Sequence, residues 1–217
     1  MNRENDYFAD ELLGRLEKES PLDIAYEAQA KSADVGFDFT SIDLAFERLT
    51  DEVREVKEAF NEWEDQKDSF DHFCDECTDV VFGVVNVIRH AGIDQKEFFR
   101  GLEIGNPPIP SSTSLRQALE NLEGLFQKLR RDFESRGSNG EFPQSFPEKA
   151  RSLVRFATHF INVAGGNAES VTRKNVKKYL TRCQFIEKQL RSEGKMWGDI
   201  PLENIYARWK EVKRSGL

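Results

Sequence analysis

The sequence lacks the long apolar runs that membrane proteins need. No segment approaches the roughly 18 consecutive apolar residues of a membrane-spanning helix. The first residues, MNRENDYFADELL, also lack the basic stretch followed by apolar residues that is typical of a secretion signal. We therefore expect a cytoplasmic protein that does not bind a membrane.

An excess of positive charge is missing as well. The formal net charge is -8, whereas binding to a nucleic-acid duplex depends on a basic face that contacts phosphates. The charge therefore argues against a nucleic-acid duplex as a partner. Small phosphorylated ligands remain compatible with it, because a bound metal ion reverses the local field.

Cysteine and histidine are scarce, with three of each in the chain. Cys74 and Cys77 form a CxxC pair, which can belong to a zinc site or to a redox dithiol. No second CxxC exists, and this pair falls inside a helical pattern instead of opening a helix after a strand. We therefore expect these thiols to be buried for structural reasons.

What the sequence has in abundance is helical periodicity. Hydrophobic residues make up 38% of the chain, which is enough for a core. Apolar residues recur at helical spacing, and no segment shows the alternation of a half-buried strand. The predicted fold class is all-α, with Ser41 and Ser114 as N-caps. The expected helices cover about 7–17, 21–33, 41–65, 70–91, 94–104, 112–135, 147–164, 168–193 and 201–213.

The two sides of the proline-rich break at 105–112 resemble each other. A shift of 73 residues pairs Ala45 with Ala118, and the same shift continues into the next helix, where it pairs Ile88 with Ile161. Amphipathic helices align easily, so a chance match is the alternative. One constant register across two helices and a variable loop favours a tandem repeat of a helical hairpin.

This repeat predicts the organisation of the chain. We expect a single all-α domain over 1–217, with a first hairpin at 41–104, a second at 112–180 and a C-terminal helical extension at 181–217. The hairpins would be related by an approximate two-fold axis and form a four-helix bundle. Such a chain buries within itself what would otherwise be a dimer interface. Formation of a homodimer is still compatible with this organisation.

Four acidic residues form the most informative pattern in the sequence. Glu52 and Glu55 stand three residues apart, as do Glu76 and Asp79, and each pair lies in an apolar amphipathic stretch. Helical residues at i and i+3 share a face, so two such helices side by side would bring four carboxylates together. This cluster needs a counter-charge. Hard oxygen ligands favour Mg²⁺, or alternatively Mn²⁺, over zinc.

The alternative is a solvated helix face, because charged residues make up 32% of the chain. Against it stands the apolar run VVFGVVNVI directly after Asp79. The second hairpin also argues against a solvated face. If the acids served only to solvate the helix, we would expect the second hairpin to keep some of them at the matching positions. At the shift of 73, the four acids become Leu125, Lys128, Lys149 and Ser152.

The acidic pattern resembles a known signature. Glu52-x-x-Glu55 followed by Glu76-x-x-Asp79 is similar to the motif of the MazG-like all-α nucleoside triphosphate pyrophosphohydrolases, which include dimeric dUTPases and phosphoribosyl-ATP pyrophosphohydrolase. The segment AQAKSADVGFDFT resembles the one that precedes the first acidic helix in MazG proteins, and KYLTRC resembles part of the end of a MazG domain. The resemblance implies a MazG-type core with the four acids as metal ligands and catalytic groups.

The same resemblance implies a substrate. In the family, a Lys and an Arg four residues apart bind the triphosphate, and Lys178 and Arg182 have this spacing. The implied reaction is Mg²⁺-dependent hydrolysis of a (d)NTP to (d)NMP and pyrophosphate, for house-cleaning or control of the dNTP pool. The alternative is a catalytically silent helical protein that senses a nucleotide or binds a partner. Retention of all four acids in the first hairpin favours the enzyme.

Overall fold

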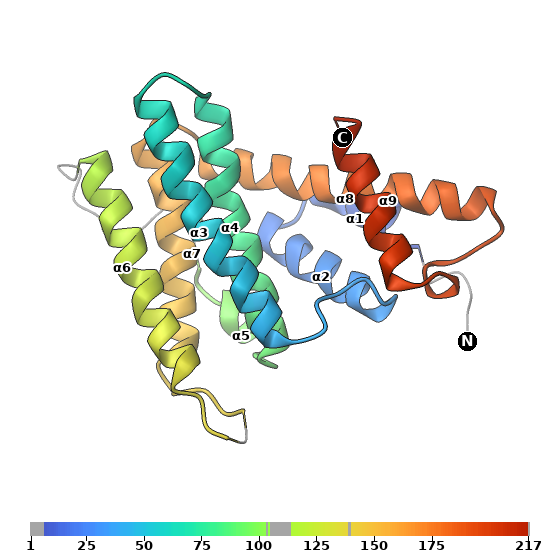
Figure 1. Cartoon of the computed structure of the whole chain (residues 1–217), viewed down its shortest axis with the longest axis horizontal. Helices are drawn as coiled ribbons and strands as arrows, with labels where there is room; N and C mark the ends of the chain where they lie inside the picture. Colours follow the sequence, from blue (N-terminus) through green and yellow to red (C-terminus); the bar gives the residue numbers. More distant parts are fainter. Residues whose placement is uncertain (1–6, 103, 105–113, 139, 217) are drawn as a thin grey trace. The chain divides into compact units, whose positions relative to one another are not determined.

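The computed structural model describes residues 7–102, 104, 114–138 and 140–216. Within these residues the regular elements are all helices, so the predicted all-α fold class is confirmed (Figure 1). None of the described helices is long and apolar enough to cross a membrane. The proline-rich break at 105–112 lies outside the described residues.

Contacts divide the chain into two compact units. One consists of Ser41–Thr172 and is called the bundle unit below. The other combines Met1–Thr40 with Arg173–Leu217 and is called the terminal unit. The expected boundary at residue 180 lies inside the continuous helix α8 (Ala168–Ser192). The division into one domain with two repeats and an extension stays a prediction.

Four long helices make up the bundle unit. Helix α3 packs against α4, α4 packs against α7, and α6 contacts both α7 and α3 (Figure 1). A short helix, α5, follows α4 and contacts α7. Their bounds are α3 Ile42–Glu64, α4 Phe70–His90, α5 Gln95–Phe99, α6 Leu115–Glu134 and α7 Phe146–Val163.

Local chemistry explains where these helices begin and how closely they pack. Ser41 Oγ accepts a hydrogen bond from the backbone N–H of Leu44, and Ser114 Oγ accepts one from that of Gln117, which confirms both predicted N-caps. At the contact of α3 with α4, a Cβ added to Gly83 would lie 3.2 Å from the Cα atom of Leu49. A glycine therefore permits the close approach of the two acidic helices.

The outer ends of the two helix pairs follow the sequence shift of 73 residues, whereas the inner ends, at the loops between α3 and α4 and between α6 and α7, depart from it by three residues. Helix α3 begins at Ile42 and α6 at Leu115, and the C-termini of α4 and α7 show the same spacing. Gly92 and Gly165, which follow the C-termini of α4 and α7, both have a positive φ, of 67° and 97°. The tandem repeat, and with it the superposition of the hairpins about a two-fold axis, stays a prediction.

The terminal unit contains α1, α2, α9 and most of α8. Helix α1 packs against α2. On α8, the buried Glu187 carboxylate accepts hydrogen bonds from the backbone N–H groups of Phe8 and Ala9, where α1 begins. This carboxylate therefore ties the start of α1 to α8. The remaining helix bounds are α1 Ala9–Leu16, α2 Pro21–Asp34 and α9 Leu202–Arg214.

The cysteines are structural in their placement. Cys74, Cys77 and Cys183 are buried and form no disulfide, and burial of the CxxC pair is what the sequence predicted. Burial raises the pKa of the Cys77 thiol well above its usual value, and the nearby Cys74 adds to this. A thiol held in its neutral form is a poor metal ligand and a poor nucleophile.

Candidate metal centre

The two acidic pairs lie on the two helices that pack most closely in the bundle unit. Glu52 and Glu55 belong to α3, and Glu76 and Asp79 belong to α4. Carboxylate oxygens of Glu52, Glu76 and Asp79 lie within 4.8 Å of one another. Glu52 is only 6% exposed. The structure therefore brings three of the four acids into one group, which we call the acid cluster.

Glu55 lies at the edge of this cluster. Its carboxyl group lies close enough to Glu52 to add to the raised pKa of that residue. Its own carboxylate also faces two guanidinium groups, with Oε2 lying 3.5 Å from Nη2 of Arg48 and Oε1 lying 3.6 Å from Nη2 of Arg54. Its side chain is 31% exposed. Glu55 is thus a neighbour of the cluster with access to solvent.

Burial and a neighbouring charge disfavour the ionised forms of two acids of the cluster. Burial raises the pKa of Glu52 to about 9, and the charge of Asp79 adds to this. Burial and Asp79 likewise raise the pKa of Glu76 to about 7. The protonated forms of Glu52 and Glu76 are therefore favoured in the metal-free protein, and a bound cation would favour their ionised forms.

Two buried oxygens of the cluster also lack a protein partner. Oε2 of Glu52 and Oε2 of Glu76 are buried, and no hydrogen-bond donor among the described residues reaches them. A buried carboxylate oxygen without a donor is costly. A divalent cation would satisfy both oxygens and balance their charge, and an all-oxygen donor set suits Mg²⁺ or Mn²⁺. The residues present therefore fit the expected metal.

A second group of possible ligands lies near the first. Nδ1 of His72 is 3.6 Å from Oε1 of Glu76, and its Nε2 is 3.6 Å from Oδ2 of Asp68. Glu62, Asp68 and His72 also form a group with ligand atoms within 4.8 Å. Glu62 and Asp68 are exposed, and water can solvate them without a metal, so this group lacks the charge problem of the acid cluster.

In the second hairpin, a basic residue stands at the position that matches Glu76. Lys149 stands where the shift of 73 residues places Glu76. Its Nζ lies 2.5 Å from Oδ1 of Asp132, whose other oxygen accepts a hydrogen bond from Ser145 Oγ at 2.6 Å. A protein cation therefore neutralises the buried acid there. The first hairpin has no such lysine at position 76.

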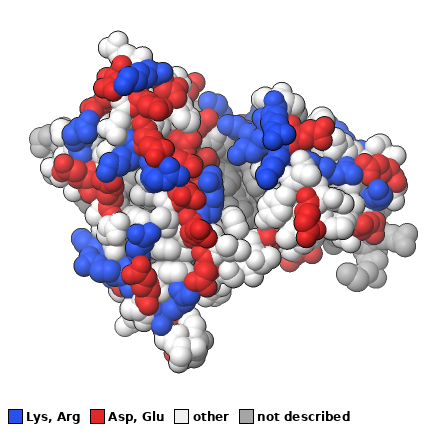
Figure 2. Space-filling model, viewed as in Figure 1, with Lys and Arg blue, Asp and Glu red and all other residues white. Residues whose placement is uncertain are grey.

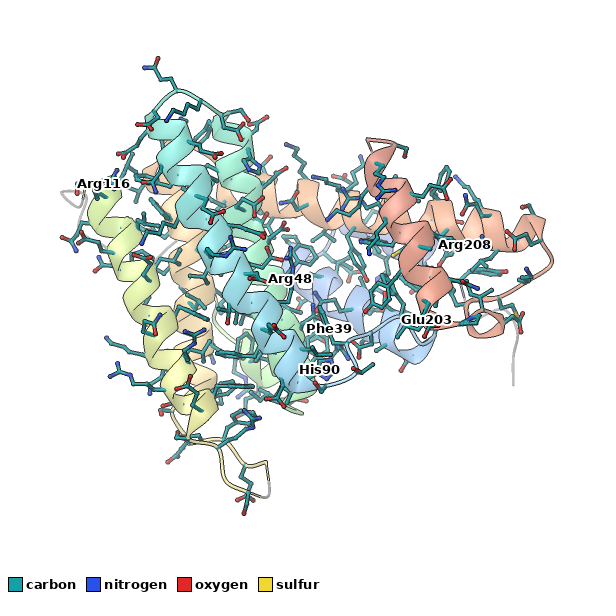
Figure 3. All side chains as sticks on the ribbon, viewed as in Figure 1. Phe39, Arg48, His90, Arg116, Glu203 and Arg208 are labelled. Carbon is teal, nitrogen blue, oxygen red and sulfur yellow. The ribbon has the colours of Figure 1, made fainter. Side chains whose placement is uncertain are left out.

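Sequence reasoning missed Arg48, although its position could have revealed it. Arg48 precedes Glu52 by four residues on α3, so the two side chains share a face. Its Nε lies 2.6 Å from Oε1 of Glu52. Figure 3 shows Arg48 on this helix, and Figure 2 shows acidic and basic side chains interspersed along it. Arg48 is the cation that lies closest to the buried Glu52.

The two predicted phosphate-binding residues lie on α8 in the terminal unit. Lys178 is exposed, and Arg182 is half-buried with its guanidinium carbon 5.6 Å from the centre of the Trp209 ring. The acid cluster belongs to the bundle unit. A joint action of these cations and the acids on one substrate stays a prediction.

Comparison with known proteins gives one informative similarity. Over 121 residues the chain is 23% identical to the nucleoside triphosphate pyrophosphohydrolase/pyrophosphatase MazG of Thermotoga maritima. The match covers 50% of this chain and 46% of that protein, so the chain spans about half the length of this relative. No family model and no solved structure matches the chain. The chain is therefore similar to a MazG protein at a distance.

Proposed function

We propose that this protein is a divalent-cation-dependent hydrolase of nucleoside triphosphates, which releases a (d)NMP and pyrophosphate. The acid cluster carries this proposal, because three converging carboxylates with two orphaned buried oxygens call for a cation. The similarity to a protein named as a nucleoside triphosphate pyrophosphohydrolase supplies the substrate class. House-cleaning or control of the dNTP pool would be its role.

The roles of the acids follow from their burial. Glu52, Glu76 and Asp79 would hold Mg²⁺ or Mn²⁺, which when bound withdraws charge from phosphate oxygens and makes water more acidic. Glu55 has the more accessible carboxylate, since its side chain is 31% exposed against 14% for Glu76. We therefore assign Glu55 as the group that accepts the proton of the attacking water, while the water oxygen forms a bond to the α-phosphorus and pyrophosphate leaves.

We assign Lys178 and Arg182 to binding of the triphosphate group of the substrate. A triphosphate keeps negative charge that one metal ion does not cancel, and positioned cations stabilise it in the ground state and in the transition state. Their spacing of four residues on α8 places both on one helix face. The family resemblance supports the assignment of this pair to phosphate binding.

A pyrophosphate-release assay tests the proposal. Purified protein is incubated with a panel of canonical and damaged NTPs and dNTPs, with Mg²⁺ and then with EDTA, and the products are separated by chromatography. We expect (d)NMP and pyrophosphate from at least one nucleotide, only with metal, and loss of turnover in Glu76→Gln. Nucleotide binding without turnover across the whole panel would instead support the silent sensing protein.

A further inference from the structure

Arg48 forms ion pairs with acids of the proposed metal site, and binding of a metal ion does not require these pairs. Its Nε lies 2.6 Å from Oε1 of Glu52, and its Nη2 lies 3.5 Å from Oε2 of Glu55. One guanidinium therefore bridges the two acids of α3. Its side chain is 41% exposed while that of Glu52 is 7% exposed, so the cation reaches inward from the solvent side.

This cation is an incomplete substitute for a metal ion. It engages only one oxygen of Glu52 and leaves Oε2 without a donor. It also contributes a single positive charge to a site with three clustered carboxylates and the adjoining Glu55. A divalent ion in the cluster would repel the guanidinium at close range. The contact between Arg48 and Glu52 is therefore suited to the metal-free protein.

A displaced Arg48 has a natural second partner if the protein binds nucleotides. The guanidinium group is a planar fork that matches phosphate oxygens in two-point contacts. Its side chain is long and already reaches solvent, so rotation about its own bonds can move the charged group without a change in the helix. A triphosphate that arrives with the metal ion would bring anionic oxygens to the same edge of the cluster.

We propose that Arg48 is a resident counter-cation, which leaves the carboxylates when the divalent ion binds and then contacts the phosphate groups of the nucleotide. This inference rests on the proposed function and adds a residue to it. One consequence is thermodynamic coupling, because Arg48 opposes binding of the metal alone and favours binding of the metal together with a triphosphate. Metal and nucleotide should therefore bind cooperatively.

Two binding measurements test this role without reliance on turnover or on the identity of the base. The first is titration of Mn²⁺ alone, followed by electron paramagnetic resonance of the free ion. The second is titration of inorganic tripolyphosphate at saturating Mn²⁺, followed by calorimetry. Both use the full chain as wild type, Arg48→Ala and Arg48→Lys. The control is Lys57→Ala, which removes a cation of the same helix that pairs with Glu123 at 2.8 Å.

Arg48→Ala should change the two affinities in opposite directions. Removal of the competing cation should tighten the binding of Mn²⁺ alone by up to about fivefold, the range of a partly exposed ion pair. Loss of the phosphate contact should weaken tripolyphosphate binding by about 10-fold to 100-fold, as for a charge-assisted hydrogen bond. Arg48→Lys should bind Mn²⁺ like wild type and lose part of the tripolyphosphate affinity, and Lys57→Ala should change neither.

Other outcomes separate the two claims. If wild type binds Mn²⁺ and Arg48→Ala binds Mn²⁺ equally well or more weakly, Arg48 supports the cluster structurally and the inference is wrong, while the metal centre stands. Unchanged tripolyphosphate affinity in Arg48→Ala overturns the phosphate contact and with it the inference. A wild-type protein that binds no Mn²⁺ removes the metal centre, the proposed function and the role of Arg48 together.

Discussion

The replacement Glu52→Gln should change how stability depends on pH in the metal-free protein. Burial and the charge of Asp79 raise the pKa of Glu52 from an ordinary 4.5 to about 9. The folded protein therefore holds this proton more tightly than the unfolded chain does. The stabilisation from the protonated group is fully present below about pH 4.5 and is lost as the pH rises through about 9.

The size of this effect follows from the width of the pH window. Within it, each pH unit lowers the free energy of unfolding by about 1.4 kcal/mol. Between pH 5 and pH 8, ionisation of Glu52 should therefore cost the folded state on the order of 4 kcal/mol. For a domain the size of the bundle unit this is a fall in Tm of roughly 10–20 °C. A glutamine at position 52 has no proton to lose, so this part of the slope should vanish.

The assay is thermal unfolding followed by circular dichroism at pH 5, 6, 7 and 8 in EDTA. Wild type should lose much more stability than Glu52→Gln over this range, and saturating Mg²⁺ should restore the stability of wild type at pH 8 but not raise that of the variant. Glu47→Gln, an exposed change on the same helix, should behave like wild type. Equal pH slopes in wild type and Glu52→Gln would refute the account of the acid cluster.

Three further predictions concern the site and its scaffold. Glu76→Gln should lower kcat at least 100-fold and weaken Mn²⁺ binding while the circular dichroism spectrum keeps its helical shape; turnover near the wild-type rate would contradict its role as a ligand. Lys178→Ala and Arg182→Ala should each lower kcat/KM by about tenfold or more through loss of a phosphate contact, with unchanged affinity for Mn²⁺ alone; wild-type kinetics in the double variant would remove both from the site. Gly83→Ala should destabilise the protein by about 1–3 kcal/mol and weaken Mn²⁺ binding, because the added Cβ would lie 3.2 Å from the Cα atom of Leu49, so that α3 would have to shift slightly away from α4. A stable Gly83→Ala variant with full Mn²⁺ affinity in calorimetry would show that this close approach is not needed.

Much of the fold could be predicted because helix ends and helix faces are local properties. The pattern at 41–65 gives α3 within one residue at each end, since Ser41 caps it and apolar residues line one face. The helix expected at 94–104 is shorter in the structure. Helix α5 ends at Phe99, because Gly101 adopts a positive φ of 68°. That glycine was the local stop signal in the sequence.

The site was only partly predictable, because side-chain burial and pairing depend on tertiary packing. The i,i+3 spacing correctly placed each acidic pair on one helix face, and the apolar context of α4 indicated burial. Spacing does not reveal that Glu55 lies at the edge of the cluster or that Arg48 reaches Glu52. The boundary between the two units, which falls within α8, could not be predicted from the sequence either, because the helix continues across it.

The most direct test of the central claim is anomalous diffraction from crystals grown with Mn²⁺ and a non-hydrolysable triphosphate analogue. We predict a strong anomalous peak enclosed by the carboxylates of Glu52, Glu76 and Asp79, with the triphosphate beside it. A peak at Glu62, Asp68 and His72 alone, or no peak at the acid cluster, would contradict the assignment of these carboxylates as the metal centre.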